Sequence, residues 1–159
     1  MNTRDSLPRG MMIFSAVVSL SLQFLPLPSM LEDVRPPVLV LTVIYWSLAV
    51  PRAGGIMLGF IAGLAIDVFK GAVLGQYALA TSLIAYLAIR QHLLVRNKPV
   101  FEQALLVGVA LTIYELVAWL IDGWSGHAMG GIARWLPIVT GAAVWPVVTG
   151  LLGQTHARR

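Results

Sequence analysis

The stretch that decides the fold is residues 55–71, which read GIMLGFIAGLAIDVFKG. A glycine or the single carboxylate Asp67 recurs at every fourth position from Gly55 to Gly71, and the residues between are almost all apolar. Residues four apart lie on one face of an α-helix, so the pattern predicts a helix with a flat face that ends in a carboxylate. Small residues at this spacing let membrane helices pack backbone to backbone. The stretch therefore indicates a membrane helix packed closely against another helix.

The composition extends this interpretation to the whole chain. Of 159 residues, 58% are hydrophobic and 11% are charged, whereas a soluble domain carries about 25% charged residues. This apolar content exceeds what one compact core hides, so the surplus must face lipid. The net charge of +4 comes from Lys and Arg residues dispersed along the chain, which excludes a nucleic-acid patch and favours topology signals. The chain has no cysteine, which excludes disulfides and thiolate chemistry.

Six apolar stretches have about the length of a membrane-spanning helix, which needs about 20 residues. We expect spans at residues 10–27, 37–50, 53–68, 76–95, 100–121 and 132–152, in one integral membrane domain over residues 1–159. Only Pro51-Arg52 separates the second span from the third, so these two must form a tight hairpin or a re-entrant pair. The predicted fold class is an all-α polytopic membrane protein with six transmembrane helices in one bundle.

The basic residues predict which side each loop faces, because Lys and Arg concentrate in short cytoplasmic loops. With six spans and a cytoplasmic N-terminus, eight basic residues lie inside, namely Arg4, Arg9, Arg52, Arg90, Arg96, Lys98, Arg158 and Arg159. Three lie outside, namely Arg35, Lys70 and Arg134, together with the loop acids Glu32, Asp33 and Asp122. A five-span topology would place one basic end outside. We therefore expect a multi-pass membrane protein with both termini in the cytoplasm.

Two carboxylates lie inside predicted spans, Asp67 and Glu115. Charges at such positions are costly and usually face a bundle interior or a polar cavity. Both fall in the outer half of the membrane, where Lys70, Arg35 and Arg134 are candidate counter-charges. We expect an intramembrane polar layer of Arg35, Lys70, Glu115 and Arg134. It forms either a structural ion-pair layer or a polar pocket and partner-binding mouth.

The glycine face also has two interpretations. Its members, continued to the next loop, are Gly55, Gly59, Gly63, Asp67, Gly71 and Gly75. The face serves either packing against a neighbouring span or docking of another protein. We treat these positions as helix-packing or partner-binding residues.

The sequence has no pattern typical of an enzyme. His92, His127 and His156 lie in loops or at helix ends, and none is spaced with a carboxylate as a metal pair would be. No glycine-rich phosphate loop follows a strand, and the loops are too short to house an active site. We expect no catalytic residue, no metal and no cofactor.

Residues spread over much of the chain resemble those of a known family. They are, in order, Arg35-Pro36, Tyr45-Trp46, Pro51, Gly59-Phe60, Gly63-Leu64, Asp67, Gly71 and Leu74-Gly75-Gln76. Their order and spacing, with the chain length and the short loops, resemble the MreD family of rod shape-determining proteins. The family is also similar to the six-helix substrate-binding subunits of energy-coupling-factor vitamin transporters.

The resemblance implies a non-catalytic membrane scaffold subunit of the bacterial cell-elongation (rod) complex, which supports side-wall peptidoglycan synthesis and rod shape. It also implies that the membrane is the bacterial inner membrane. The implied direct partner is MreC. RodA, a class B penicillin-binding protein and MreB belong to the wider complex, membrane lipid surrounds the bundle, and no nucleic acid is involved. The alternative is a substrate-binding membrane subunit of a vitamin-type transporter. An outward-facing pocket with a few convergent polar groups would favour that alternative.

Overall fold

The computed structural model describes residues 3–26, 28–51, 55–128 and 130–157, and every regular element in these ranges is helical. The all-α fold class is therefore confirmed. The helices are α1 (Thr3–Gln23), α2 (Ser29–Glu32), α3 (Val38–Ala49), α4 (Gly55–Lys70), α5 (Gln76–Arg96), α6 (Val100–Ser125), the 3-10 helix η1 (Ile132–Trp135) and α7 (Leu136–Ala157). The two four-residue helices, α2 and η1, stand beside six long ones.

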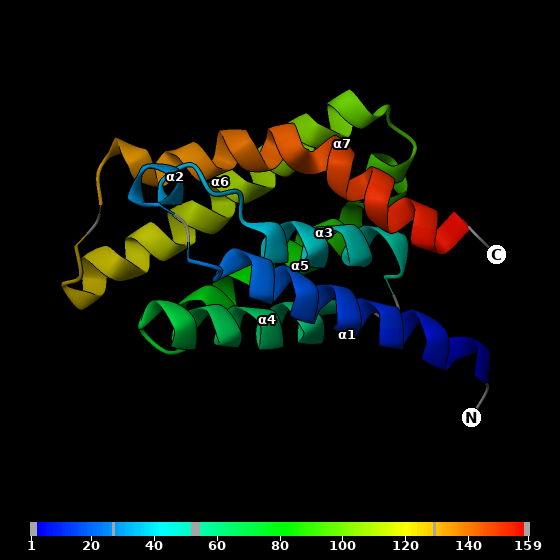
Figure 1. Cartoon of the computed structure of the whole chain (residues 1–159), viewed down its shortest axis with the longest axis horizontal. Helices are drawn as coiled ribbons and strands as arrows, with labels where there is room; N and C mark the ends of the chain where they lie inside the picture. The colour runs from blue at the N-terminus through cyan, green and yellow to red at the C-terminus, as the bar shows by residue number, and fades with distance from the viewer. Residues whose placement is uncertain (1–2, 27, 52–54, 129, 158–159) are drawn as a thin grey trace.

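The six long helices run alternately in opposite directions, which brings both termini to the same end of the bundle (Figure 1). We call this the terminal end. The opposite end carries α2, the turn between α4 and α5, and the connection from α6 to α7 (Figure 1). We call it the α2 end. Termini at one end are the arrangement that an even number of membrane crossings requires.

Helix α3 lies at the centre of the bundle. It has 12 residues, and nine of them are buried, including Leu39 through Ile44 and Trp46 through Leu48. A helix that is apolar on all sides is stable only when neighbours cover every side. Helices α1, α4, α5 and α7 contact α3 and provide that cover. At 1.5 Å per residue α3 spans only about 18 Å, so flanking residues must complete its path across a membrane.

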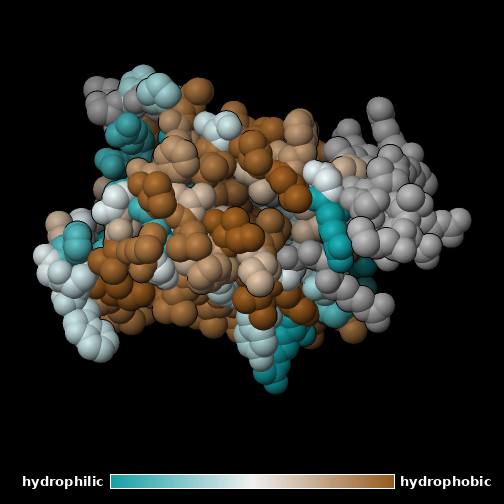
Figure 2. All heavy atoms as spheres, turned by 90° about the horizontal axis from the view of Figure 1, so that it is seen from below, coloured by the Kyte–Doolittle hydropathy of each residue, from teal (hydrophilic) through white to brown (hydrophobic). Residues whose placement is uncertain are grey.

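The outer surface of the bundle is apolar. Large side chains such as Phe14, Met57, Val68, Phe101 and Val139 are more than half exposed. Figure 2 shows hydrophobic side chains gathered over the middle of one face, with hydrophilic ones at its edges. Monomeric proteins in water rarely expose so wide an apolar surface, whereas lipid chains can cover it favourably. The exterior is therefore that of a membrane protein.

Among the described residues, three helices are long and apolar enough to cross a membrane by length and composition, namely Gln76–Arg96, Val100–Ser125 and Ile132–Gly153. Two shorter apolar helices, Arg9–Gln23 and Val38–Ala49, accompany them. Helix α4 has 16 residues, fewer than the about 20 that a full crossing needs. The count of six spans stays a prediction.

The helix bounds differ from the expected spans at several ends, since α1 begins at Thr3 and not at residue 10, and α7 continues to Ala157 and not to residue 152. Helix α1 ends at Gln23, before the expected residue 27, and α6 continues to Ser125, beyond the expected residue 121. The extension includes Asp122, which belongs to a helix and not to a loop. Helix α6 ends where Gly126 adopts a left-handed φ of 74°, the usual glycine stop of a helix. The boundary between the second and third expected spans falls on residues 52–54, outside the described residues.

Candidate functional site

Gly59 and Gly63 form the closest contact between α4 and α5. A Cβ atom on Gly59 would lie 2.9 Å from the carbonyl oxygen of Thr81, and one on Gly63 would overlap the backbone of Ala78 and Tyr77. The Thr81 hydroxyl donates a hydrogen bond to the Gly59 carbonyl oxygen at 2.6 Å. Close approach of the backbones is what makes this interhelical bond possible. Along this part of α4 the glycine face is covered by α5.

Asp67 holds the start of α5. Asp67 is only 1% exposed, and its carboxylate accepts hydrogen bonds from the backbone N–H groups of Tyr77 (2.7 Å), Gly75 (2.9 Å) and Ala78 (3.4 Å). The first N–H groups of a helix have no partner within the helix, and the helix dipole favours a negative charge there. Asp67 therefore caps α5 from the preceding helix.

The remaining glycines of the repeat serve the backbone. Gly55, Gly71 and Gly75 have φ values of 56°, 63° and 99°, and a Cβ atom on any of them would meet nothing within 4 Å. Positive φ strains every residue except glycine, so these three positions shape the start of α4 and the turn into α5. The four-residue repeat thus has two physical causes, helix packing in the middle and backbone conformation at both ends.

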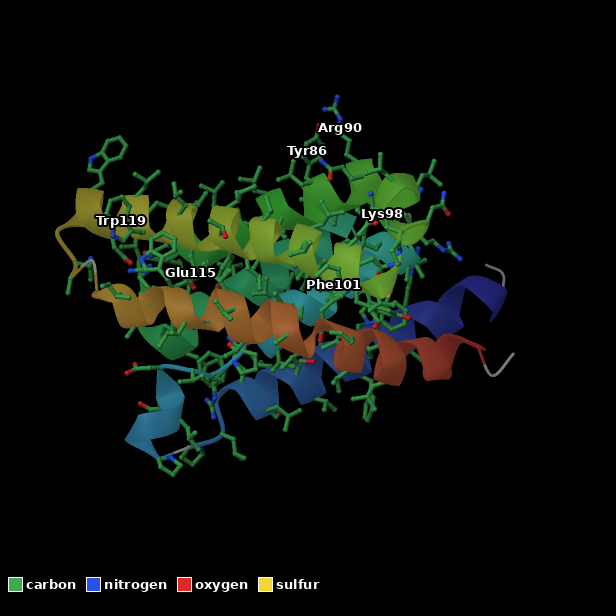
Figure 3. The ribbon with its side chains drawn as sticks, turned by 90° about the horizontal axis from the view of Figure 1, so that it is seen from above. Tyr86, Arg90, Lys98, Phe101, Glu115 and Trp119 are labelled. Atoms are coloured by element: carbon green, nitrogen blue, oxygen red, sulfur yellow. The ribbon has the colours of Figure 1, made fainter. Side chains whose placement is uncertain are left out.

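Arg134 joins two acids of α6 at the α2 end. Its Nε atom lies 3.2 Å from Glu115 Oε2, and its Nη1 atom lies 2.5 Å from Asp122 Oδ2. Gln76 of α5 donates to the other oxygen of Asp122 at 2.7 Å. Figure 3 shows Glu115 turned inward between α6 and α7, whereas Tyr86 and Arg90 point away from the bundle. The network ties α5, α6 and η1 together through groups that are mostly shielded from solvent.

Lys70 and Arg35 make no ion pair within the described ranges. The Lys70 ammonium donates to the Tyr77 hydroxyl at 3.3 Å and lies 4.4 Å from the centre of the same ring. The Arg35 guanidinium donates to the backbone carbonyl oxygens of Gln23 and Leu25. Their partners are neutral, so neither positive charge is balanced by a contacting carboxylate.

All four residues of the expected polar layer line two adjoining cavities at the α2 end. The larger one, which we call the α2-end cavity, has a volume of 460 Å³. Its lining consists of Gln23, Phe24, Glu32, Arg35, Pro36, Pro37, Phe69, Lys70, Tyr114, Glu115 and Pro137. The second cavity, of 370 Å³, shares Glu32, Lys70, Glu115 and Pro137 with it and adds Arg134. The charged residues therefore meet around hollow space, not in one closed cluster.

A third hollow lies on the side of the bundle, between α1 and α7 and above α3. This lateral groove has a volume of 590 Å³ and is lined by residues within 10–22 of α1, 38–46 of α3 and 148–152 of α7. Its few polar groups are satisfied internally, because the Trp46 indole donates to the Ser15 hydroxyl at 2.8 Å and Ser19 pairs with Thr42 at 2.7 Å. The hydroxyl groups of Ser15, Ser19 and Thr42 are therefore all hydrogen-bonded, and the groove presents a mainly apolar surface.

Comparison with known proteins identifies the family. The family model for the rod shape-determining protein MreD matches residues 4–155. A curated relative, the rod shape-determining protein MreD of Haemophilus influenzae, is 31% identical over 161 residues, covering 99% of this chain and 98% of the relative. This chain belongs to the MreD family. No solved structure matches it.

Family membership confirms the resemblance that the sequence motifs indicated, and it places this MreD-family chain among membrane proteins that determine rod shape and are not enzymes. Several motif residues have structural contacts in this chain. Trp46 is fully buried and bonded to α1, Asp67 caps α5, and Gly59 admits Thr81. The motifs through which the family resemblance was found therefore include contacts that hold the bundle together.

Three polar residues of this MreD-family site were given no role from the sequence, namely Gln23, Tyr114 and Gln76, although Gln76 belongs to one of the family motifs. Gln23 accepts from the Leu39 N–H at 3.0 Å, Gln76 joins α5 to α6, and Tyr114 is 2% exposed beside the α2-end cavity. The available signal was their position near the end of an apolar run, where buried polar groups need partners. Of the histidines, His92 bonds its own helix at Ile89 and His127 is exposed.

Proposed function

We propose that this chain is a non-catalytic scaffold subunit of the bacterial cell-elongation (rod) complex, with MreC as its direct partner. RodA, a class B penicillin-binding protein and MreB complete the proposed assembly. Membership of the MreD family supports this proposal. The role is to hold partners in the membrane and thereby support side-wall peptidoglycan synthesis.

The lateral groove is the observation that carries the proposal. The glycine face at Gly59 and Gly63 is covered by α5, so it has no room for a second helix. The groove, in contrast, is open along α1 and α7, and Leu22 and Leu151 on its two walls are 54% and 64% exposed. Helices in a membrane associate by close packing of complementary surfaces. A hollow of 590 Å³ receives the side chains along one face of a single spanning helix, which is the element we assign to MreC.

Bulky substitutions in the groove test this assignment. Leu22→Trp and Leu151→Trp fill the groove from its two walls, whereas Leu120→Trp and Leu105→Trp add the same bulk on α6, away from it. The controls are matched in exposure, at 54% and 58%. We expect the two groove variants to capture less co-expressed MreC per purified chain than either control. Mass spectrometry of the same pull-down reports RodA and the penicillin-binding protein.

Two outcomes of that experiment are decisive. Equal capture of MreC by all four well-folded variants would remove the groove as the docking surface. Loss of MreC from the α6 variants alone would move the docking surface to the opposite side. Gel filtration of each variant in the same detergent separates a lost partner from a misfolded chain.

The proposed topology has six spans and both termini in the cytoplasm, which places the α2 end outside. The chain has no cysteine, so single-cysteine variants can be labelled without background. His127 at the α2 end and Asn97 at the terminal end are both exposed. We expect a membrane-impermeant maleimide to label His127→Cys in spheroplasts, and Asn97→Cys only after permeabilisation. The reverse pattern would invert the proposed orientation.

A further inference from the structure

The α2-end cavity is rich in hydrogen-bond donors that the bundle does not use. Tyr114 is 2% exposed, and within the described residues its hydroxyl has no hydrogen-bond partner. Gln23 uses its carbonyl oxygen on the Leu39 N–H, and its amide nitrogen has no acceptor in the same ranges. Neither atom is among the described side-chain atoms that are both fully shielded and without a partner, so both are open to the cavity and available to a ligand. Both residues line the cavity.

The two cations of the cavity lining make no contact with a carboxylate within the described residues. Its lining holds two cations, Arg35 and Lys70, and two carboxylates, Glu32 and Glu115. Glu115 is already paired with Arg134 of the adjoining cavity at 3.2 Å. Arg35 and Lys70 contact only neutral groups, and Glu32 is exposed. An anionic group in the cavity would give Arg35 and Lys70 the contacting negative charge that they lack, whereas a cation would be repelled by both.

We propose that the α2-end cavity binds the phosphodiester of a phospholipid headgroup. A phosphodiester carries one negative charge and accepts several hydrogen bonds at once. Arg and Lys are the usual partners of phosphate oxygens, and the Tyr114 hydroxyl and the Gln23 amide add neutral donors. Phe24, Phe69 and three prolines supply the apolar part of the lining, which suits the glycerol and the first carbons of the chains. The cavity lies at an end of the bundle, where headgroups lie in a bilayer.

This inference goes beyond the proposed function and does not depend on it. The site belongs to the chain alone, and neither MreC nor the lateral groove contributes to it. A failure of MreC capture would therefore not contradict the lipid site, and a failure to bind lipid would not contradict the scaffold role. The test uses the purified full-length chain without partners.

Native mass spectrometry in a mild detergent measures the binding. The probe is phosphatidylglycerol, whose phosphodiester gives it a net charge of −1, and the comparator is diacylglycerol, which has acyl chains but no phosphate. Lys70→Gln removes one cation of the site, and Tyr114→Phe removes only a hydroxyl that has no partner among the described residues. Because that hydroxyl makes no bond within the bundle, the fold should not suffer from its loss. Arg90→Gln, which removes an exposed cation outside the cavity, is the matched control.

We expect the wild-type chain to retain phosphatidylglycerol in preference to diacylglycerol. Binding should fall about tenfold in Lys70→Gln and roughly threefold in Tyr114→Phe, with no change in Arg90→Gln. Equal retention by the wild type and both cavity variants would overturn the proposal. An equal loss in Arg90→Gln would also overturn it, because the lipid would then follow overall charge.

A soluble competitor identifies the source of the phosphodiester. Glycerophosphoglycerol carries the same headgroup without acyl chains. Displacement of the lipid by this compound would show that the headgroup alone is recognised, so a soluble diester is also a ligand. Retention of the lipid despite an excess of competitor, together with the loss in Lys70→Gln, would show that the acyl chains contribute and that the ligand is the membrane lipid.

Discussion

The contact of Gly63 with α5 supports a sharp prediction about stability. In Gly63→Ala the new methyl group would meet the Thr81 hydroxyl and the backbone of Ala78 and Tyr77. Backbone atoms cannot rotate away as a flexible side chain does, so α4 and α5 must separate. Overpacking of this kind costs about 1–3 kcal/mol, and alanine recovers about 0.5–1 kcal/mol through its better helix propensity. The difference spans about 0–2.5 kcal/mol, and because the new Cβ atom would overlap three atoms we expect a net loss in the upper part, about 1–2 kcal/mol.

Thermal unfolding in detergent, followed by circular dichroism, measures this loss. For a chain of this size 1 kcal/mol shifts the midpoint by about 2–4 °C, so Gly63→Ala should unfold about 2–8 °C below the wild type. Gly150→Ala is the matched control, because Gly150 lies within α7 and a Cβ atom there meets nothing within 4 Å. Its midpoint should stay the same or rise slightly. A Gly63→Ala midpoint at or above the wild-type value would refute the packing argument, as would an equal fall in Gly150→Ala.

Three further changes test the α4–α5 turn and the ion network by the same method. Asp67→Asn replaces one acceptor oxygen by an N–H donor and should lower the free energy of unfolding by about 1–3 kcal/mol. The control Glu102→Gln, in an exposed ion pair, should lower it by only about 0.3–0.5 kcal/mol. Equal shifts of the two midpoints would contradict the capping role of Asp67. Arg134→Met removes the ion-pair partner of Glu115 and Asp122, two shielded carboxylates, and should lower the free energy of unfolding by about 3 kcal/mol or more. An unchanged unfolding midpoint would show that the network does not stabilise the bundle. Gly75→Ala forces a φ of 99° on alanine and should lower the free energy of unfolding by about 1–2 kcal/mol. The control Gly10→Ala, where a Cβ atom meets nothing within 4 Å, should leave it unchanged. Similar midpoints for both variants would contradict the strain argument.

Helix positions were predictable because each apolar run ends at prolines, glycines or charges. Residues 76–95 and 100–121 are matched closely by α5 and α6, and the difference lies at the end of α6. The sequence around Asp122 and Gly123 is typical of a loop. The helix continues because Arg134 and Gln76 bind Asp122, and both lie far from it in the chain. Such tertiary contacts leave no local signal.

The partners of the intramembrane acids were predictable only in part. Lys70 follows Asp67 by three residues, which made it a candidate counter-charge, yet Asp67 binds backbone N–H groups of α5 and Lys70 binds Tyr77. The outcome depends on the turn at residues 71–75, whose conformation brings the start of α5 over Asp67. A helix start can replace a cation as the partner of a carboxylate, because its N–H groups carry partial positive charge. Sequence spacing alone does not distinguish the two kinds of partner.

The division of the glycine repeat also separates stability from assembly in this chain. Because α5 occupies the face at Gly59 and Gly63, substitutions there should first loosen α4 from α5 and affect partners only through misfolding. Leu22 and Leu151, in contrast, are exposed and far from that contact, so their substitution should change partner capture while the unfolding midpoint stays the same. A variant set with both readouts therefore distinguishes a bundle that fails to fold from one that folds and fails to bind. If Gly63→Ala lost MreC while its unfolding midpoint was unchanged, the glycine face would have to be reachable by a partner, and the contact with α5 would have to open in the membrane.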